Sequence, residues 1–189
     1  VAVADATRPG RPVVYVNDDA SGIGTGSDWA NACTSIEAAL IVAQGYGVSE
    51  VWVAGGSYPE SLVLPSNVAL RGGYAGSGTT RDIGAYPTTI DGSTARSGSP
   101  AWHVVTMDSL TNTVLEGFTI TGGNASGSNP HDRGGGVYCN NADASNTIVE
   151  CTISGNTASY GGGIFFTDSA AVLTSCTISG NTANTGGGG

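Results

Sequence analysis

The chain has 189 residues, enough for one domain with a buried core. It contains no lysine and sets six basic against fifteen acidic residues, for a net charge of −9. This charge argues against nucleic acid and anionic lipid as partners, and no apolar run approaches the roughly 20 residues of a membrane span.

The N-terminal segment Val1–Thr7 precedes the first predicted strand and does not begin with Met. A secretory product has this appearance after its signal peptide has been removed, and so does an edited sequence. The remaining composition, rich in Thr, Ser, Asn and Gly, suits an extracellular protein. We therefore expect a secreted or cell-surface location.

A strand is predicted over Pro12–Val16, followed by a polar loop over residues 17–28. The loop carries three carboxylates, Asp18, Asp19 and Asp28, which makes it a weak candidate for Ca²⁺. It lacks the ligand spacing of an EF-hand and of nonapeptide calcium repeats. The alternative is a turn in which Asp and Asn bond to their own backbone. No other metal or cofactor is expected, since no zinc-type Cys/His spacing is present.

One helix is predicted, over Thr34–Gln44. Thr34 and Glu37 fit a capping box, and Gly45 is the expected stop. The apolar residues recur at the spacing of one helix face: Ile36, Ala39, Leu40 and Ala43. We expect this helix to cover the open N-terminal end of the strands that follow, where edges would otherwise be unpaired. Residues 1–50 would then form an N-terminal unit of strand, acidic loop and capping helix.

Short strands follow, separated by turn residues. They are predicted at Val51–Ala54, Ser61–Leu64, Val68–Leu70, Thr88–Ile90 and His103–Met107. The polar, glycine-rich stretch Gly72–Asp82 is predicted to be a protruding loop. Trp52 and Trp102 lie in or beside strands, where they either pack against the fold or stack on a sugar ring.

The C-terminal part of the chain repeats itself. The pattern of Gly134–Cys139 recurs at Gly161–Phe166, and Gly186–Gly189 begins the same pattern a third time. Glu150–Ala158 and Ser175–Ala183 match at eight of nine positions, with a period of 25 residues. A period this short, rich in β-branched residues and turn residues, indicates strands joined by turns rather than a helical hairpin.

Aligning the repeats predicts three apolar ladders directed into one core. They are Ile120/Ile153/Ile178, Phe118/Cys151/Cys176 and Leu115/Ile148/Leu173. Small hydroxyl residues, Thr119, Thr152 and Thr177, alternate with them and should point outward. Stacked strands would lie ~4.8 Å apart. The fold class expected over residues 51–189 is all-β, a right-handed parallel β-helix (solenoid), with the Asn after each corner glycine bonding along the axis.

All four cysteines fall at positions where an inward apolar group is expected: Cys33, Cys139, Cys151 and Cys176. Buried thiols are one reading, because core Cys behaves as a small hydrophobe. A disulfide is the other, and Cys151–Cys176 is its best candidate, since a stacked separation of ~4.8 Å lies inside the permitted range.

The longest insertion lies within Gly123–Arg133, because Ile120 and Ile153 are eight residues further apart than the repeat period. Loops of this kind display binding groups. Asn124 begins an Asn-Ala-Ser sequon for N-glycosylation, which matters only if the source glycosylates such sites.

The insertion ends in the densest polar cluster after the acidic loop, His131, Asp132 and Arg133. These residues are weak catalytic candidates, because three neighbours on one loop do not all face one site. The alternative is a solvated loop with a local ion pair.

The repeats carry a family resemblance. Gly161-Gly-Gly-Ile164 and Ile153-Ser-Gly-Asn156 resemble the paired Gly-Gly-Ala-Ile and Phe-x-x-Asn repeats of the polymorphic outer-membrane proteins, which many secreted bacterial β-helix proteins share. The resemblance covers nearly the whole chain, including Leu70–Tyr74 and Gly117–Asn124. Ile153 and Ile178 replace the expected Phe. The resemblance implies the fold and a secreted bacterial origin, and it leaves activity open.

Two functions from different classes remain. The first is a non-catalytic structural or adhesive surface protein, whose long Thr, Ser and Asn face binds cell-surface or glycan ligands. The alternative is a polysaccharide lyase or glycoside hydrolase. A lyase would need a cation and a base, and a hydrolase two carboxylates about 5 to 10 Å apart.

The C-terminal end suggests assembly. Gly186–Gly189 begins another repeat that is not followed by its strands. Either the chain is part of a longer repeat protein, or a second copy covers this end. Head-to-tail contacts that do not close would build a fibre.

Overall fold

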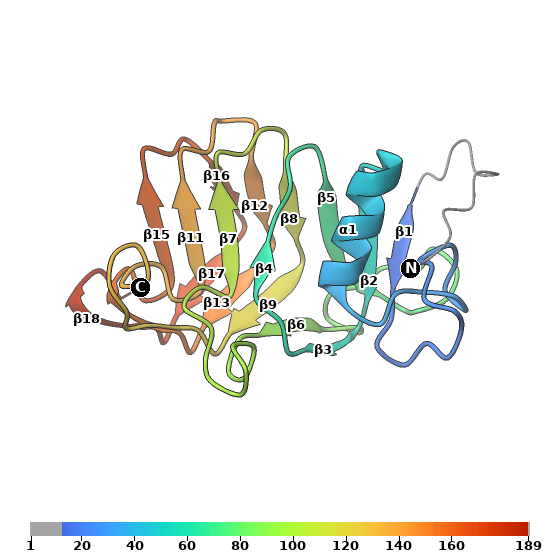
Figure 1. The fold of residues 1–189 in the computed structure, drawn as a ribbon, viewed down its shortest axis with the longest axis horizontal. Coiled ribbons are helices and arrows are strands. Elements are labelled where there is room, and N and C mark those ends of the chain that lie inside the picture. The colour runs from blue at the N-terminus through green and yellow to red at the C-terminus, as the bar shows by residue number, and fades with distance from the viewer. Residues whose placement is uncertain (1–12, 189) are drawn as a thin grey trace.

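The computed structural model describes residues 13–188, which form parallel β-sheets and one short helix (Figure 1). The six-stranded sheet contains, in order, β1 (Val14–Val16), β2 (Glu50–Ala54), β5 (Ala69–Tyr74), β8 (Val114–Glu116), β12 (Thr147–Val149) and β16 (Val172–Thr174). The five-stranded sheet contains β3 (Gly56–Tyr58), β6 (Thr88–Asp91), β9 (Phe118–Thr121), β13 (Thr152–Ser154) and β17 (Thr177–Ser179).

Two smaller sheets complete the arrangement. The four-stranded sheet contains β4 (Leu62–Val63), β7 (Val105–Asp108), β11 (Val137–Asn140) and β15 (Ile164–Thr167). The three-stranded sheet contains β10 (Asn124–Ala125), β14 (Thr157–Tyr160) and β18 (Thr182–Gly186). Because the chain visits the sheets in turn and adds one parallel strand at each visit, the arrangement is all-β and consistent with a solenoid-like fold.

The strands pair in the register that the sequence repeat predicts. Ile153 pairs with Ile120 on one side and Ile178 on the other, and Ile148 pairs likewise with Leu115 and Leu173. The inner members of these ladders are fully buried, whereas Leu173 and Ile178 are half-buried in the last strands. Phe118 and Cys151 are buried beside them, and Cys176 is half-buried.

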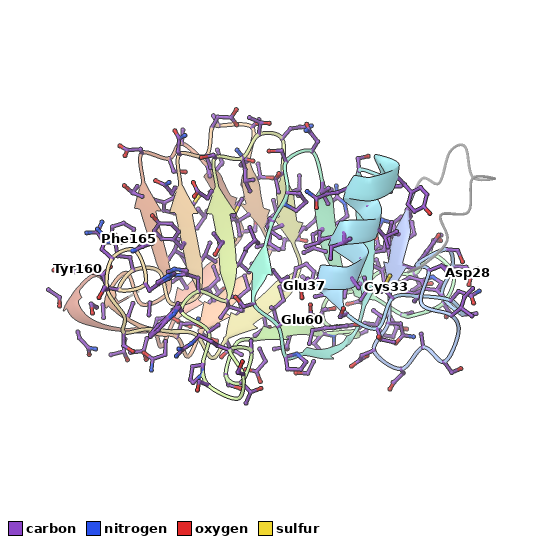
Figure 2. All side chains as sticks on the ribbon, in the orientation of Figure 1. Asp28, Cys33, Glu37, Glu60, Tyr160 and Phe165 are labelled. Carbon is purple, nitrogen blue, oxygen red and sulfur yellow. The ribbon has the colours of Figure 1, made fainter. Side chains whose placement is uncertain are left out.

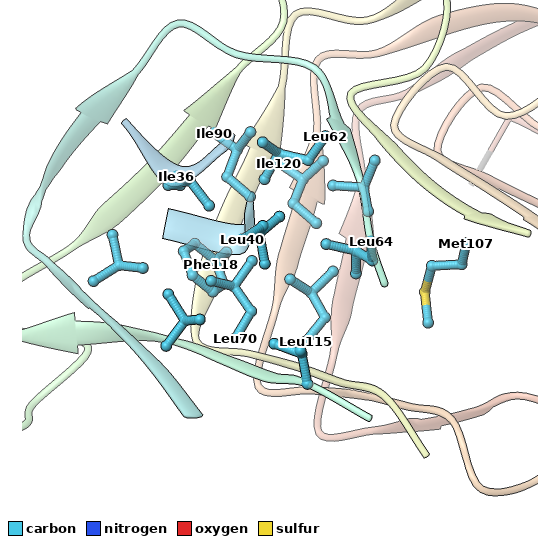
Figure 3. Packing of buried hydrophobic residues seen from close by; sticks show 14 of the residues in the cluster. Ile36, Leu40, Leu62, Leu64, Leu70, Ile90, Met107, Leu115, Phe118 and Ile120 are labelled. Carbon is cyan, nitrogen blue, oxygen red and sulfur yellow. The ribbon is translucent and has the colours of Figure 1, made fainter. Parts of the chain in front are cut away.

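The core fills the space between the sheets. Figure 3 shows the helix residues Ile36 and Leu40 pointing into the same space as Leu62, Ile90 and Phe118. The four cysteine side chains are free thiols, three of them buried. The buried-thiol interpretation therefore holds for Cys33, Cys139 and Cys151, whereas Cys176 is a free thiol that is only half-buried.

Asparagine side chains bond along the stack, as expected from the repeat. The Asn156 Nδ2 group donates to the Asn181 Oδ1 atom at 3.1 Å and to the Ile120 carbonyl at 3.0 Å. Its Oδ1 atom accepts from the Gly123 N–H at 2.9 Å. The preceding Gly155 has φ +67°, a left-handed conformation that turns the chain at the corner.

The helix α1 spans Ile36–Tyr46, two residues later than predicted. Ser35 and not Thr34 is the N-cap, because the Ser35 side chain accepts from the Ala38 N–H. A later segment supplements this cap: the Glu60 carboxylate accepts from the Ile36 and Glu37 N–H groups, both at 2.8 Å. At the other end, Gly47 is the C-cap with φ +65°, so the predicted stop at Gly45 is wrong.

The expected position of α1 across the N-terminal end is also corrected. The helix runs alongside the strands and packs against β1 and β2, so it forms a lateral wall of the core (Figure 1). The outer edge of β1 is covered by the loop that follows it. The Tyr15 N–H donates to the Gly26 carbonyl at 3.1 Å, and the Cys33 N–H donates to the Tyr15 carbonyl at 2.9 Å. Backbone pairing by the loop, rather than a helix, therefore protects this edge.

The predicted loop over Gly72–Asp82 starts too early. Gly72, Gly73 and Tyr74 belong to β5 and are buried, because the strand continues past Leu70. The exposed loop follows Tyr74, and its Arg81 folds back to donate to the Gly72 carbonyl at 2.8 Å.

Other boundaries shift by one or two residues. The predicted strands near Ser61–Leu64 and His103–Met107 are β4 and β7, and β10 adds a short strand inside the predicted insertion. The predicted processed segment Val1–Thr7 lies outside the described residues. Within residues 13–188, no helix is long and apolar enough to cross a membrane.

Candidate functional site

Five aromatic rings form a continuous stack, the aromatic column. Its members are Trp102, His131, His103, Tyr138 and Phe165, with successive centroid separations of 5.7, 5.4, 4.9 and 6.4 Å. Tyr138 and Phe165 stack because they are paired residues of the neighbouring strands β11 and β15. His103 lies just before β7, and His131 joins the column from the insertion. Figure 2 shows Phe165 near Tyr160, towards the β18 end of the molecule.

Arginines lie against both ends of the aromatic column. The Arg96 Cζ atom is 3.8 Å from the Trp102 ring centroid. The Arg133 Cζ atom is 5.1 Å from the Phe165 centroid and 5.7 Å from the Tyr160 centroid. Cation–π attraction at these distances orients both guanidinium groups.

The two histidines of the column have defined tautomers. The His103 Nδ1 atom lies 3.1 Å from the Gly134 carbonyl, which can only accept, so Nδ1 carries a proton. Neutral His103 therefore accepts at Nε2, and the His131 Nδ1 atom, 3.3 Å away, must be the donor. Burial lowers the pKa of His103, and the His131 ring lowers it further, while the Gly134 carbonyl and Asp132 partly oppose this. His103 is thus held neutral.

A groove runs beside the Trp102 end of the column, and we call it the Trp102 groove. Its volume is about 270 Å³. It is lined by Ser61, Ala95, Arg96, Ala101, Trp102, His103, Thr106 and His131. None of these residues is acidic, although acidic residues outnumber basic ones in the chain fifteen to six.

The predicted trio does not converge on one point. His131 lines the Trp102 groove, whereas Arg133 lies over Tyr160 and Phe165. The Asp132 Oδ1 and Arg133 Nε atoms form an ion pair at 3.4 Å, and both are buried without a hydrogen-bond partner within the described part of the chain. The Asp132 carbonyl accepts from Tyr160, which ties the loop to β14.

The outer side of the five-stranded sheet forms a second surface, the hydroxyl face. Successive strands place one hydroxyl residue at the same register position, in the column Ser57, Thr89, Thr119, Thr152 and Thr177. These residues point outward because their neighbours Ile90, Ile120 and Ile153 are fully buried. Strand spacing sets a repeat of ~4.8 Å along the column. A parallel row carries Asp91, Thr121, Ser154 and Ser179.

The acidic loop forms a turn. The Asp28 carboxylate accepts from the Asn31 N–H at 2.8 Å and from the Ser27 hydroxyl at 2.9 Å, and these bonds lower its pKa. The Asn17 side chain accepts from the Asp19 N–H, and Asp18 is exposed. Across residues 13–188, no group of three His, Cys, Asp or Glu side chains is arranged to hold a metal ion. Asp28 lies at the end of the molecule opposite Tyr160 (Figure 2).

A second aromatic cluster covers the outer side of the six-stranded sheet, and sequence reasoning missed it. Trp52 stacks on Tyr74 at 4.5 Å and contacts Tyr15, which contacts Trp29 at 4.8 Å. Ion pairs continue it, from Glu50 to Arg71, Arg71 to Glu116 and Glu116 to Arg81. Trp52 therefore packs against the fold. The feature that could have predicted this cluster is the shared register of its strands, which only the strand pairing reveals. The residues at this register are Tyr15, Trp52, Arg71 and Glu116.

The sequon residue Asn124 is half-buried at the start of β10, where its backbone pairs with Thr157. The insertion is thus partly regular structure rather than a free loop.

The sequence model of one protein family, described as a protein of unknown function (DUF1565), matches residues 19–188. No curated protein and no solved structure matches the chain.

Proposed function

We propose that this chain, which belongs to the DUF1565 family of proteins of unknown function, is a non-catalytic structural or adhesive protein of the bacterial cell surface. The proposal includes secretion and binding to surface glycans. It rests on one observation, the hydroxyl face.

The hydroxyl face suits a repetitive, hydroxylated ligand. Five residues with hydroxyl groups stand in one column at a fixed spacing of ~4.8 Å on a sheet whose other side is packed core. The sheet holds the hydroxyls in place, so little conformational entropy is lost on binding. Each hydrogen bond adds only about 0.5–1.5 kcal/mol net, so useful affinity requires many at once. A polysaccharide surface offers such an array.

The proposal also specifies the fold as a right-handed parallel β-helix, with repeats of the type found in polymorphic outer-membrane proteins. Its support is that residues one period apart, such as Ile153 and Ile178, occupy paired positions in adjacent strands. The glycine runs beginning at Gly134 and Gly161 also precede the paired strands β11 and β15.

Assembly is part of the proposal. Within residues 13–188, β15, β16, β17 and β18 are each the last strand of their sheet, with one edge unpaired. Exposed strand edges accept further strands. The partner is either a further repeat of a longer surface protein or a second copy joined head to tail in a fibre. Electron microscopy and light scattering separate these: polymers that the substitution Ile178→Asp disperses support the fibre, and a stable monomer contradicts it.

Adhesion is tested by sedimentation with insoluble polysaccharides. The double substitution Thr152→Lys/Thr177→Lys places long charged chains on the hydroxyl face and should reduce the bound fraction about tenfold, because the hydrogen-bonding array is blocked. Thr174→Lys is the matched control, since Thr174 is an exposed strand threonine on the six-stranded sheet. Equal binding by both variants and the wild type would contradict adhesion through this face.

The alternative function, a polysaccharide lyase or glycoside hydrolase, is favoured by the Trp102 groove, where Arg96 and two histidines meet. A neutral imidazole there could act as a base. Release of unsaturated or reducing sugars from a pectin, alginate and glycan panel, abolished by His131→Gln, would establish the enzyme and overturn the non-catalytic assignment.

A further inference from the structure

Arg96 is exposed, yet two contacts fix its guanidinium group. Its Cζ atom lies 3.8 Å from the Trp102 ring centroid, and its Nε–H donates to the Pro100 carbonyl at 3.0 Å. Within the described chain, its two terminal nitrogens make no hydrogen bond or ion pair. The groove therefore holds an oriented pair of N–H donors without a protein acceptor.

His131 supplies a second group at the same groove. Its Nδ1–H is committed to the buried His103, so only its Nε2 atom is free for a ligand. Trp102 contacts both polar groups, since Arg96 lies over its ring and His131 stacks on it with an interplanar angle of 22°. Trp102 is thus a positioning residue for the two side chains.

The charge of the groove selects an anion. No carboxylate lines it, so the Arg96 charge is not neutralised locally. The chain as a whole carries −9, which repels a dianion twice as strongly as a monoanion. A planar carboxylate matches the guanidinium fork and satisfies both conditions.

The remaining lining selects a sugar. Thr106 contributes a hydroxyl, and Ser61, whose hydroxyl donates to the His103 carbonyl at 2.8 Å, offers its oxygen as an acceptor. Ala95 and Ala101 contribute small apolar surfaces, which complete the mixture that a sugar ring with its hydroxyl and C–H groups requires. The volume of about 270 Å³ is just below the roughly 300–1,000 Å³ of pockets for drug-sized ligands, so it suits one sugar unit.

We infer that the Trp102 groove binds a carboxylate-bearing sugar residue, with its carboxylate on Arg96 and the His131 Nε2 atom near its polar groups. This inference rests on the groove alone and is independent of adhesion through the hydroxyl face.

Calorimetric titration with glucuronate tests the inference, with glucose and inorganic phosphate as comparison probes. The wild-type protein should bind glucuronate, and this binding should weaken as the salt concentration rises. Glucose and phosphate should bind at least about tenfold less tightly than glucuronate. Arg96→Gln should weaken glucuronate binding about tenfold. Arg96→Lys should weaken it by less, because lysine keeps the positive charge but lacks the two parallel N–H donors of the guanidinium group. Trp102→Leu should also weaken binding, whereas Trp102→Phe, which keeps a ring beneath Arg96, should rescue most of it.

Control variants make the outcome decisive. Arg96→Gln removes an exposed side chain, so its circular dichroism and unfolding midpoint should match the wild type. Thr152→Lys/Thr177→Lys should leave glucuronate binding unchanged, which separates this site from the hydroxyl face. Equal affinity for glucose and glucuronate would overturn the carboxylate. Equal affinity for phosphate and glucuronate would contradict recognition of a sugar. Unchanged glucuronate binding in Arg96→Gln would contradict the Trp102 groove as the binding site.

Discussion

Asn156 connects strands through one buried side chain. It is 1% exposed, and its amide bonds to Gly123, Ile120 and Asn181 all run to neighbouring turns of the chain. Asn156→Ala leaves a buried N–H and a buried carbonyl without partners, which should lower the free energy of unfolding by about 2–4 kcal/mol. Urea denaturation measures this. Asn140→Ala, at a half-exposed side chain that bonds to Asp108, should change it by less than about 1 kcal/mol. Equal losses would show that the bonds of Asn156 carry no special weight.

Cys151 and Cys176 occupy equivalent positions but differ in reactivity. Burial, with a smaller contribution from Cys176, raises the pKa of Cys151 to about 12, so almost no thiolate forms at neutral pH. Cys176 is half-buried. Iodoacetamide at pH 8 should therefore alkylate Cys176 in the native protein and Cys151 only after unfolding, as read by peptide mass spectrometry. Alkylation of both at one rate would contradict the buried position of Cys151.

His103 makes stability depend on pH. Burial lowers its pKa in the folded protein below the ordinary 6.5, so the unfolded chain binds more protons between these two values. The stability that neutral His103 contributes to the folded state is fully present above pH 6.5. It is lost as the pH falls from 6.5 through the pKa of His103 in the folded protein. His131, Tyr138, Asp132, Arg133 and the Gly134 carbonyl face this ring.

The pH effect is measured by urea midpoints between pH 8 and 5. His103→Gln has no proton to gain in this range, so its midpoint should fall less than that of the wild type. A parallel fall in both proteins would assign the pH dependence to other groups.

At the scale of elements, α1 depends on a residue outside it. Glu60 accepts from two N–H groups of the first helical turn, where the helix dipole also favours a carboxylate. Glu60→Ala should therefore destabilise the protein by about 1–2 kcal/mol in urea denaturation. Glu37→Ala is the control, because Glu37 is exposed on the same turn and should matter less than about 0.5 kcal/mol. The reverse order would reject capping by Glu60.

The elements differ in how far the sequence predicts them. The ladders through Ile153 and Ile148 were predictable, because residues one repeat period apart in the sequence occupy paired positions in adjacent strands. The start of α1 was predicted only approximately, since Glu60, which supplements the Ser35 cap, lies 24 residues after Ile36 and belongs to no local motif. The N-terminal edge was misassigned for a related reason: backbone pairing by the loop near Cys33 leaves no signature in side-chain pattern.

The Trp102 groove was beyond local patterns altogether. The sequence offers Trp102 as either a packing residue or a sugar-stacking ring, and His131 as one of three weak catalytic candidates, without placing the two together. Arg96 comes from a third segment, and no spacing rule links the three. The hydroxyl face was predicted more fully, because Thr119, Thr152 and Thr177 recur with the repeat itself.

At the scale of the whole molecule, each strand depends on its neighbours, so position along the stack sets the effect of a core mutation. Ile153 is fully buried between two strands, and Ile178 is half-buried in the last described strand of its sheet. Ile153→Asp should abolish folding, because an unpaired carboxylate would be buried. Ile178→Asp should leave a folded protein that unfolds at lower urea. Circular dichroism distinguishes the two, and a folded Ile153→Asp variant would contradict the stacked core.

The pairing of residues one period apart also sets how such a chain can change in length. Duplicating 25 residues inserts one complete layer, about 4.8 Å thick, without disturbing the layers on either side. Extra residues placed inside a strand would shift its register and turn core residues toward water, whereas the eight extra residues between Ile120 and Ile153 leave the pairing of these two residues intact. The stack of strands can therefore grow or shrink only in whole layers, while the segments between strands can vary in length. Each added layer extends the row of Thr119, Thr152 and Thr177 by one hydroxyl, so reach and the number of contacts grow together.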